Sequence, residues 1–112
     1  MSQVRREKVD RSELTDLPPH CACGGMLRPG VVWFGEMLPE GAMERAAAAV
    51  QTSEVLIVAG TSAQVYPAAG LIPLAIANGS TVIEVNPDAT DFSDAVAFAL
   101  HGPSAQILPQ LA

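Results

Sequence analysis

The sequence predicts an α/β fold in which helices connect the strands of a parallel sheet. Three short segments, at 55–59, 81–85 and 95–100, are mainly apolar and show no alternation, as is typical of parallel strands covered on both faces. Segments of helical length separate or precede them. This order predicts part of a Rossmann-like domain, with ligands expected at the carboxyl ends of the strands.

The first elements along the chain are a lead-in and a short strand. Residues 1–19 are charged and then rich in proline, which predicts a flexible lead-in. The compact part is expected to begin near His20. Residues 31–34, VVWF, are apolar and lie between Gly30 and Gly35, so they predict a short buried strand.

Two helices are expected before the second of the three parallel strands. The segment GAMERAAAAVQ is rich in alanine and predicts a helix that ends near Gln51. A second helix is expected at about 67–78. Pro73 lies within it and should kink it or divide it into two pieces, whereas Asn78 and Gly79 form a suitable C-terminal cap.

Composition narrows the possible classes of function. With 112 residues, 49% of them hydrophobic, the chain fits one small domain or part of a larger one. Its net charge of −6 argues against binding of nucleic acid. No stretch approaches the roughly 20 apolar residues of a membrane span, and the polar start is unlike a secretory signal. We therefore expect a cytoplasmic protein with no membrane partner.

Small and polar residues follow two of the predicted strands. Gly60 would let the backbone approach a ligand, and the hydroxyls of Thr61 and Ser62 could bond ribose or phosphate oxygens. Glu84, 24 residues after Gly60, and Asn86 close the next strand, near the spacing at which dinucleotide folds contact a ribose. The full glycine-rich fingerprint is absent, so ordinary turns without a ligand stay open as the alternative.

Two cysteines indicate a metal site. Cys21 and Cys23 lie on a glycine-containing loop, CACGG, and such a pair is a poor disulfide framework that more often binds metal in a reducing compartment. Two thiolates supply half of a tetrahedral zinc site, so the other ligands are expected outside this chain. His20 could be a third ligand, but an adjacent His and Cys rarely reach one metal, so His20 is interpreted as a solvated loop residue. His101 is interpreted as a structural residue.

Four segments, taken in order, resemble the second half of bacterial sirtuins. They are CACGGMLRPGVVWFGEMLPEG, VLIVAGTSAQVYPAAG, TVIEVNPDAT and GPSAQILPQL. The resemblance implies that residues 20–112 are the C-terminal half of a sirtuin catalytic domain, after the lead-in at 1–19. Residues 20–30 would be half of a small zinc module, and residues 31–112 would be part of a Rossmann-like, deoxyhypusine-synthase-like NAD-binding domain.

The resemblance also implies roles for individual residues. Cys21 and Cys23 would be the second pair of a structural four-cysteine zinc site, although the family often spaces this pair by two residues. The residues implied to contact NAD are Gly60, Thr61, Ser62, Glu84, Asn86 and Ser104. The residues between which a substrate peptide would lie as an added strand are Val32, Phe34, Gly35, Glu36 and Val65.

The implied function is that of an NAD-dependent protein-lysine deacetylase or deacylase, which transfers the acyl group to ADP-ribose. The family's catalytic histidine and first NAD loop have no counterpart here, so no catalytic residue is assigned. The expected partners are an acyl-lysine protein or peptide substrate and either a complementary N-terminal half or a second copy of the chain. The alternative is a non-catalytic remnant that binds a nucleotide or a partner.

Overall fold

The computed structural model describes residues 17–112, which belong to two compact units. The first unit ends at Met37, and the second runs from Leu38 to Ala112. The predicted lead-in, except for its last three residues, lies outside the described part of the chain. None of the helices in the described part is long and apolar enough to cross a membrane.

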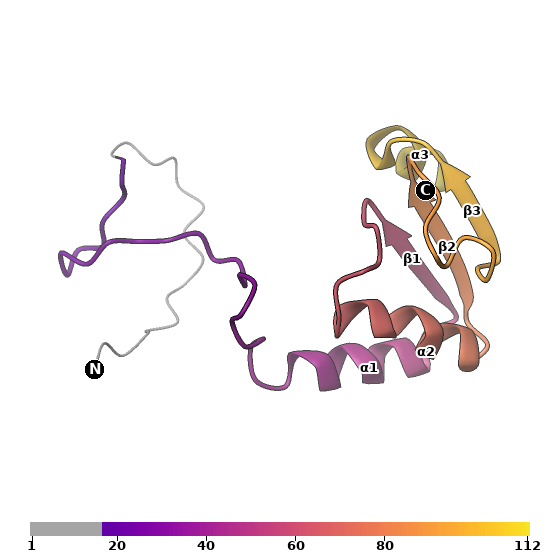
Figure 1. The fold of residues 1–112 in the computed structure, drawn as a ribbon, viewed down its shortest axis with the longest axis horizontal. Coiled ribbons are helices and arrows are strands. Elements are labelled where there is room, and N and C mark those ends of the chain that lie inside the picture. Colours follow the sequence, from indigo (N-terminus) through magenta and orange to yellow (C-terminus); the bar gives the residue numbers. More distant parts are fainter. Residues whose placement is uncertain (1–16) are drawn as a thin grey trace. The chain divides into compact units, whose positions relative to one another are not determined.

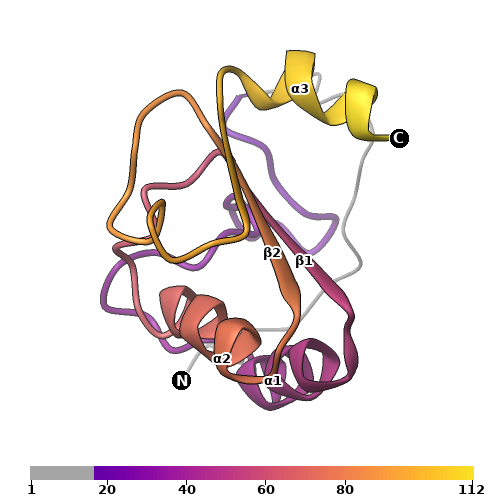
Figure 2. The ribbon, with the colours of Figure 1, turned by 90° about the vertical axis from the view of Figure 1, so that its right-hand side faces the viewer.

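The second unit is an α/β fold with a parallel sheet, as the sequence predicts. Its elements are α1 (Ala42–Thr52), β1 (Val55–Ala59), the 3-10 helix η1 (Ala68–Gly70), α2 (Leu71–Ala77), β2 (Thr81–Asn86), β3 (Phe98–His101) and α3 (Ser104–Leu111). The three strands are parallel and lie in the order β1-β2-β3. Helices α1 and α2 lie side by side, whereas α3 lies near the carboxyl ends of the strands (Figure 1, Figure 2).

The two predicted helices are confirmed, with one change of detail. Helix α1 ends at Thr52, one residue beyond the expected end. The second helix is divided into η1 and α2, but the division falls at Gly70 and not at Pro73. Pro73 lies in the first turn of α2, where its missing N–H is not needed for an intrahelical hydrogen bond. Asn78 caps α2, and Gly79 follows with a φ of 82°.

The core of the second unit lies between the sheet and helices α1 and α2. Its buried members are Val50, Ala63, Ile72, Ala75 and Val82, with Leu56, Val58, Leu71, Leu74, Phe92 and Val96 packed against them. Both helices and two strands therefore contribute apolar side chains to one cluster, and this burial is the main source of the unit's stability.

The other face of the sheet is open at β1 and β3, whereas Val85 on the same face of β2 is buried. Ile57, Ile83 and Phe98 are in register on β1, β2 and β3, so their side chains share one face. Ile57 is 48% exposed and Phe98 is 57% exposed. The expectation that β1 and β3 are covered on both faces is therefore wrong within the described residues, because α1 and α2 cover only one face.

Two predicted strands differ from the structure. Residues 31–34 form no strand and their side chains are exposed; the main chain instead enters a turn closed by a hydrogen bond from Glu36 N to Trp33 O of 3.0 Å. The strand expected at 95–100 is β3, which begins only at Phe98. The residues before it form a turn in which Val96 N donates to Phe92 O.

Candidate functional site

The carboxyl ends of the strands bring together three of the predicted NAD-contacting residues. Gly60 N donates to Val85 O at 2.9 Å, and Gly102 N donates to Asn86 O at 3.1 Å. A β-carbon placed on Gly60 would lie 3.9 Å from the Ser104 hydroxyl. Gly60, Asn86 and Ser104 therefore lie at one edge of the sheet, where parallel α/β folds bind ligands.

The turn after β1 contains two residues in the left-handed region of backbone conformation. Gly60 has a φ of 65°, and Ala63 also lies in the left-handed region with a φ of 56°. The Thr61 hydroxyl accepts a hydrogen bond of 3.1 Å from Ala63 N, so Thr61 holds the turn. Ser62 is exposed beside it. A left-handed non-glycine residue is uncommon and marks a turn that the surrounding structure must hold.

The start of α3 completes this edge. Helix α3 begins at Ser104 without a side-chain cap, so its first N–H groups favour a negatively charged or oxygen-rich ligand. Gly102 allows the chain to approach α3, because a β-carbon there would lie 2.9 Å from Ile107 Cδ1. Asn86 donates from Nδ2 to Asp88 O at 2.9 Å, which fixes the turn beside the helix.

Glu84 is placed differently from the other predicted NAD contacts. Its side chain is 2% exposed, and its two carboxylate oxygens accept hydrogen bonds from the hydroxyls of Thr90 and Ser93. Ser93 in turn accepts from Thr90 N, and Thr90 accepts from Phe92 N. Glu84 thus anchors the loop between β2 and β3, which accounts for a buried carboxylate in an otherwise apolar strand.

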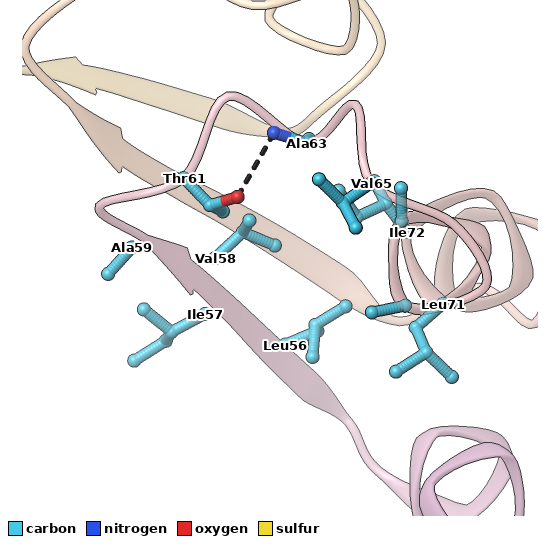
Figure 3. Close-up of a pocket in the computed structure, with 11 residues that line it drawn as sticks. Leu56, Ile57, Val58, Ala59, Thr61, Ala63, Val65, Leu71 and Ile72 are labelled. Atoms are coloured by element: carbon cyan, nitrogen blue, oxygen red, sulfur yellow. Dashed lines mark hydrogen bonds between the residues drawn. The ribbon is translucent and has the colours of Figure 1, made fainter. Parts of the chain in front are cut away.

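An apolar pocket of about 310 Å³ lies beside β1 (Figure 3). It is lined by Leu56, Ile57, Val58, Ala59, Thr61, Ala63, Val65, Ala68, Ala69, Leu71 and Ile72. No charged side chain is among them, so the pocket suits an apolar group better than a phosphate. Val65, one of the predicted peptide contacts, lines it and is exposed.

In the first unit, the cysteine loop forms a tight knuckle. Cys21 N donates to Gly25 O at 2.8 Å, and Gly24 N donates to Cys21 O at 2.9 Å. Cys23 N donates to Cys21 Sγ at 3.1 Å. The two sulfurs are joined as a disulfide, and residues 17–112 contain no cluster of three potential metal ligands.

The other predicted peptide contacts lie on an exposed segment of the first unit. Val32 and Phe34 are exposed apolar side chains, and Gly35 has a φ of 84°. Glu36 accepts hydrogen bonds from Arg28, which lower the pKa of its carboxyl group below the ordinary value, and the backbone N–H of Trp33 adds to this effect. Val65 lies in the second unit, so the two sides of the predicted peptide site stay a prediction.

Several residues at these sites were not predicted from the sequence. Arg28 and Trp33 contact Glu36, and Ala63 adopts its left-handed conformation within the turn after β1. His101 is paired in register with Asn86, at the edge described above. Its position immediately before Gly102, at the end of a predicted strand, is the signal that could have placed it there.

Comparison with known proteins gives a consistent result. The model of the Sir2 family matches residues 2–67. An NAD-dependent protein deacylase from Mycolicibacterium paratuberculosis is 48% identical over 94 residues, which are 84% of this chain and 40% of that protein. The chain thus spans about 40% of the length of this relative.

Two similar solved structures carry ligands. A Sir2 homologue in complex with NAD is 46% identical with a TM-score of 0.72, over 83% of this chain and 37% of that one. A Sir2 protein bound to an acetylated peptide is 30% identical with a TM-score of 0.71, over 87% of this chain and 41% of that one. These similarities extend across both units of the chain.

Proposed function

Because the chain belongs to the Sir2 family, we propose that it is the part of an NAD-dependent protein-lysine deacylase that binds the ribose and adenosine end of NAD and one side of the substrate peptide. The observation that carries the proposal is the meeting of Gly60, Asn86 and Ser104 at one edge of the sheet. The complexes of similar proteins with NAD and with an acetylated peptide support it.

In this proposal each residue at the sheet edge has a defined task. Gly60 lets the main chain approach the ligand, Ser62 offers a hydroxyl to the ribose, and Thr61 holds the turn in place. Asn86 and the uncapped start of α3 at Ser104 would hold the adenosine end. NAD, when bound, supplies the ribose that accepts the acyl group from lysine.

The test compares two glycines of the same conformation. Gly60 and Gly79 have φ values of 65° and 82°, so an alanine at either position costs about 1 kcal/mol of folding free energy. Only Gly60 lies at the proposed site. We expect Gly60→Ala to weaken NAD binding by about tenfold or more, and Gly79→Ala to leave it unchanged.

The measurement is a calorimetric titration with NAD, performed on the chain alone and mixed with a separately expressed N-terminal part of a sirtuin. Turnover of an acetyl-lysine peptide is followed in the same mixture. We expect turnover only in the mixture. Equal NAD affinity for the wild-type chain and Gly60→Ala would contradict the proposed NAD site, and turnover by the chain alone would contradict the assignment of no catalytic residue.

The proposal includes zinc as a structural metal. Reduced Cys21 and Cys23 would supply two thiolate ligands, and the N–H of Cys23 would stabilise the charge on Cys21 Sγ. Because two thiolates leave half of the zinc shell open, we expect less than one tightly bound zinc ion per chain. A zinc ion bound stoichiometrically by the monomer and resistant to a chelator would contradict this expectation.

A second candidate function, binding of a partner without catalysis, is favoured by the open face of the sheet. Ile57 and Phe98 expose apolar side chains on this face, and exposed apolar surface of this kind favours association. The partner would be the complementary part of a sirtuin or a second copy of the chain. Analytical ultracentrifugation of the chain alone, with Ile57→Asp as the comparison, tests the second of these.

A further inference from the structure

An ion pair between Arg28 and Glu36 spans most of the segment that carries the predicted peptide contacts of the first unit. Arg28 donates from Nη1 to Glu36 Oε1 at 2.5 Å and from Nη2 to Glu36 Oε2 at 3.1 Å. This two-pronged geometry fixes the relative orientation of the two side chains, which a single contact would not do. The ion pair therefore defines the shape of the chain between residues 28 and 36.

The same two side chains also hold the main chain between them. Arg28 Nη2 donates to Val31 O at 3.2 Å, and Glu36 Oε2 accepts from Trp33 N at 3.0 Å. Glu36 N donates back to Trp33 O at 3.0 Å, and the φ of 84° at Gly35 permits this turn. Every polar contact thus stabilises one backbone conformation of residues 31–36.

The ring of Trp33 completes the arrangement. The guanidinium carbon of Arg28 lies 3.8 Å from the centre of the Trp33 ring, which is the distance of a cation–π contact. Arg28, Trp33 and Glu36 together form a cluster that we name the clamp. In the clamp both carboxylate oxygens of Glu36 accept hydrogen bonds, so the carboxylate holds the loop.

What the clamp leaves exposed is apolar. Phe34 lies in the turn of residues 33–36 and is 92% exposed, and Val32 on the same segment is exposed as well. An exposed apolar side chain on an ordered turn has the character of a binding residue, because its ordering is not explained by burial in a core. The polar residues of the segment thus hold the backbone, and the apolar ones face solvent.

We propose that Arg28 and Trp33 are positioning residues that act with Glu36 to present Val32 and Phe34 to the acyl-lysine peptide. The inference rests on the proposed function and refines it in one respect. Phe34 and Val32 contact the peptide through their side chains, whereas Glu36 contributes through the clamp and not by contacting the peptide with its carboxylate. Preorganisation of this kind lowers the entropic cost of binding.

The sole tryptophan of the chain makes the clamp directly observable. Trp33 is the only tryptophan in the sequence, so the intrinsic fluorescence of the intact chain reports on the clamp. Arg28→Lys keeps the positive charge but loses the planar two-pronged contact, and Glu36→Gln keeps the size of the side chain but loses its charge. We expect both variants to change the emission of Trp33 and to increase its quenching by acrylamide.

Peptide affinity is measured on the same proteins by fluorescence anisotropy with a fluorescein-labelled acetyl-lysine peptide. We expect Arg28→Lys and Glu36→Gln to weaken binding by about fivefold, the size of effect that exposed ion pairs produce. The matched control is Arg45→Lys, because Arg45 is an exposed arginine of the second unit with a single contact to Glu40 O.

The outcomes separate the clamp from the proposed function. Unchanged Trp33 fluorescence in both variants would overturn the clamp, whether or not the peptide affinity changes. Changed fluorescence with unchanged peptide affinity would show a clamp that serves stability alone and would overturn the positioning role. A wild-type chain that binds no peptide would overturn the peptide-binding part of the proposed function, while the fluorescence would still decide whether the clamp forms.

Discussion

The contacts that stabilise each of the two units differ in kind. Within residues 17–37 no side chain is buried, and the contacts are hydrogen bonds, the ion pair and cation–π contact of the clamp, and the disulfide of the cysteine knuckle. The second unit instead has a continuous apolar core beneath its sheet. Apart from the disulfide, the first unit therefore depends on local polar contacts, which are individually weak. The second unit depends on burial, which adds up over many side chains.

The difference suits the two ligands of the proposed function. A ligand such as NAD needs backbone groups in fixed positions, and the core beneath the sheet supplies this rigidity at the edge near Gly60. An extended peptide needs an accessible segment of main chain and exposed apolar side chains, and the segment around Phe34 has both. Three predictions, ordered from the largest expected effect to the smallest, test this division.

The largest loss of stability is expected when a substitution creates a cavity in the core of the second unit. Ile72 is 4% exposed and belongs to the core cluster, so Ile72→Ala should lower the free energy of unfolding by about 2 to 5 kcal/mol. Phe34→Ala removes a larger side chain from the first unit, but that side chain is 92% exposed. We expect it to change stability by less than about 0.5 kcal/mol.

Urea unfolding followed by far-UV circular dichroism measures both variants. The comparison between the units fails if Phe34→Ala destabilises the chain as much as Ile72→Ala does. In that case Phe34 would be packed in solution, and its role as an exposed peptide contact would have to be abandoned.

A smaller effect is expected at the one buried carboxylate of the described residues. Glu84→Ala leaves the hydroxyls of Thr90 and Ser93 without their acceptor, which should cost about 1 to 3 kcal/mol of unfolding free energy. Glu84→Gln keeps one carbonyl acceptor and should cost less. Glu40→Ala, at an exposed position, is the control and should be close to neutral.

The Glu84 variants also distinguish anchoring of the loop from contact with NAD. If the carboxylate serves the loop alone, Glu84→Gln should lose stability while its NAD affinity, measured calorimetrically, stays near that of the wild type. A large loss of NAD affinity without loss of stability would support the prediction that Glu84 contacts NAD.

The fold of the second unit could be predicted because its signals are local and repeated. Apolar runs at 55–59 and 81–85, the alanine-rich helix that ends at Thr52 and the cap at Asn78 and Gly79 each follow from neighbouring residues. The sheet edge near Gly60 follows from topology, since parallel strands present their carboxyl ends together. These parts of the fold and of the site were therefore accessible from the sequence.

The errors arise where polar side chains outside an apolar segment decide its conformation. VVWF has the composition of a strand, but its backbone is held by Arg28 and Glu36, which lie on either side of it. Glu84 similarly anchors the turn before β3, so that this strand begins only at Phe98. Such pairs have no periodicity in the sequence, so hydrophobic patterns could not reveal them. The open face of β1 was missed because an apolar run does not show how many layers cover it.

The smallest effect, and the most specific to the first unit, is a dependence on pH. Hydrogen bonds from Arg28 and from the backbone of Trp33 hold the pKa of Glu36 below its ordinary value of 4.5. The contribution of the clamp is therefore complete above the unfolded-state pKa and is lost as the pH falls through the lower folded-state pKa. The pKa of Arg28 is raised by the same contact, so its titration lies far above this range.

We expect Trp33 fluorescence to stay constant from pH 8 to pH 5 and to change only below about pH 4.5. Glu36→Gln should abolish that transition, and a transition of the wild type centred above pH 5 would show that the carboxylate is not held by Arg28.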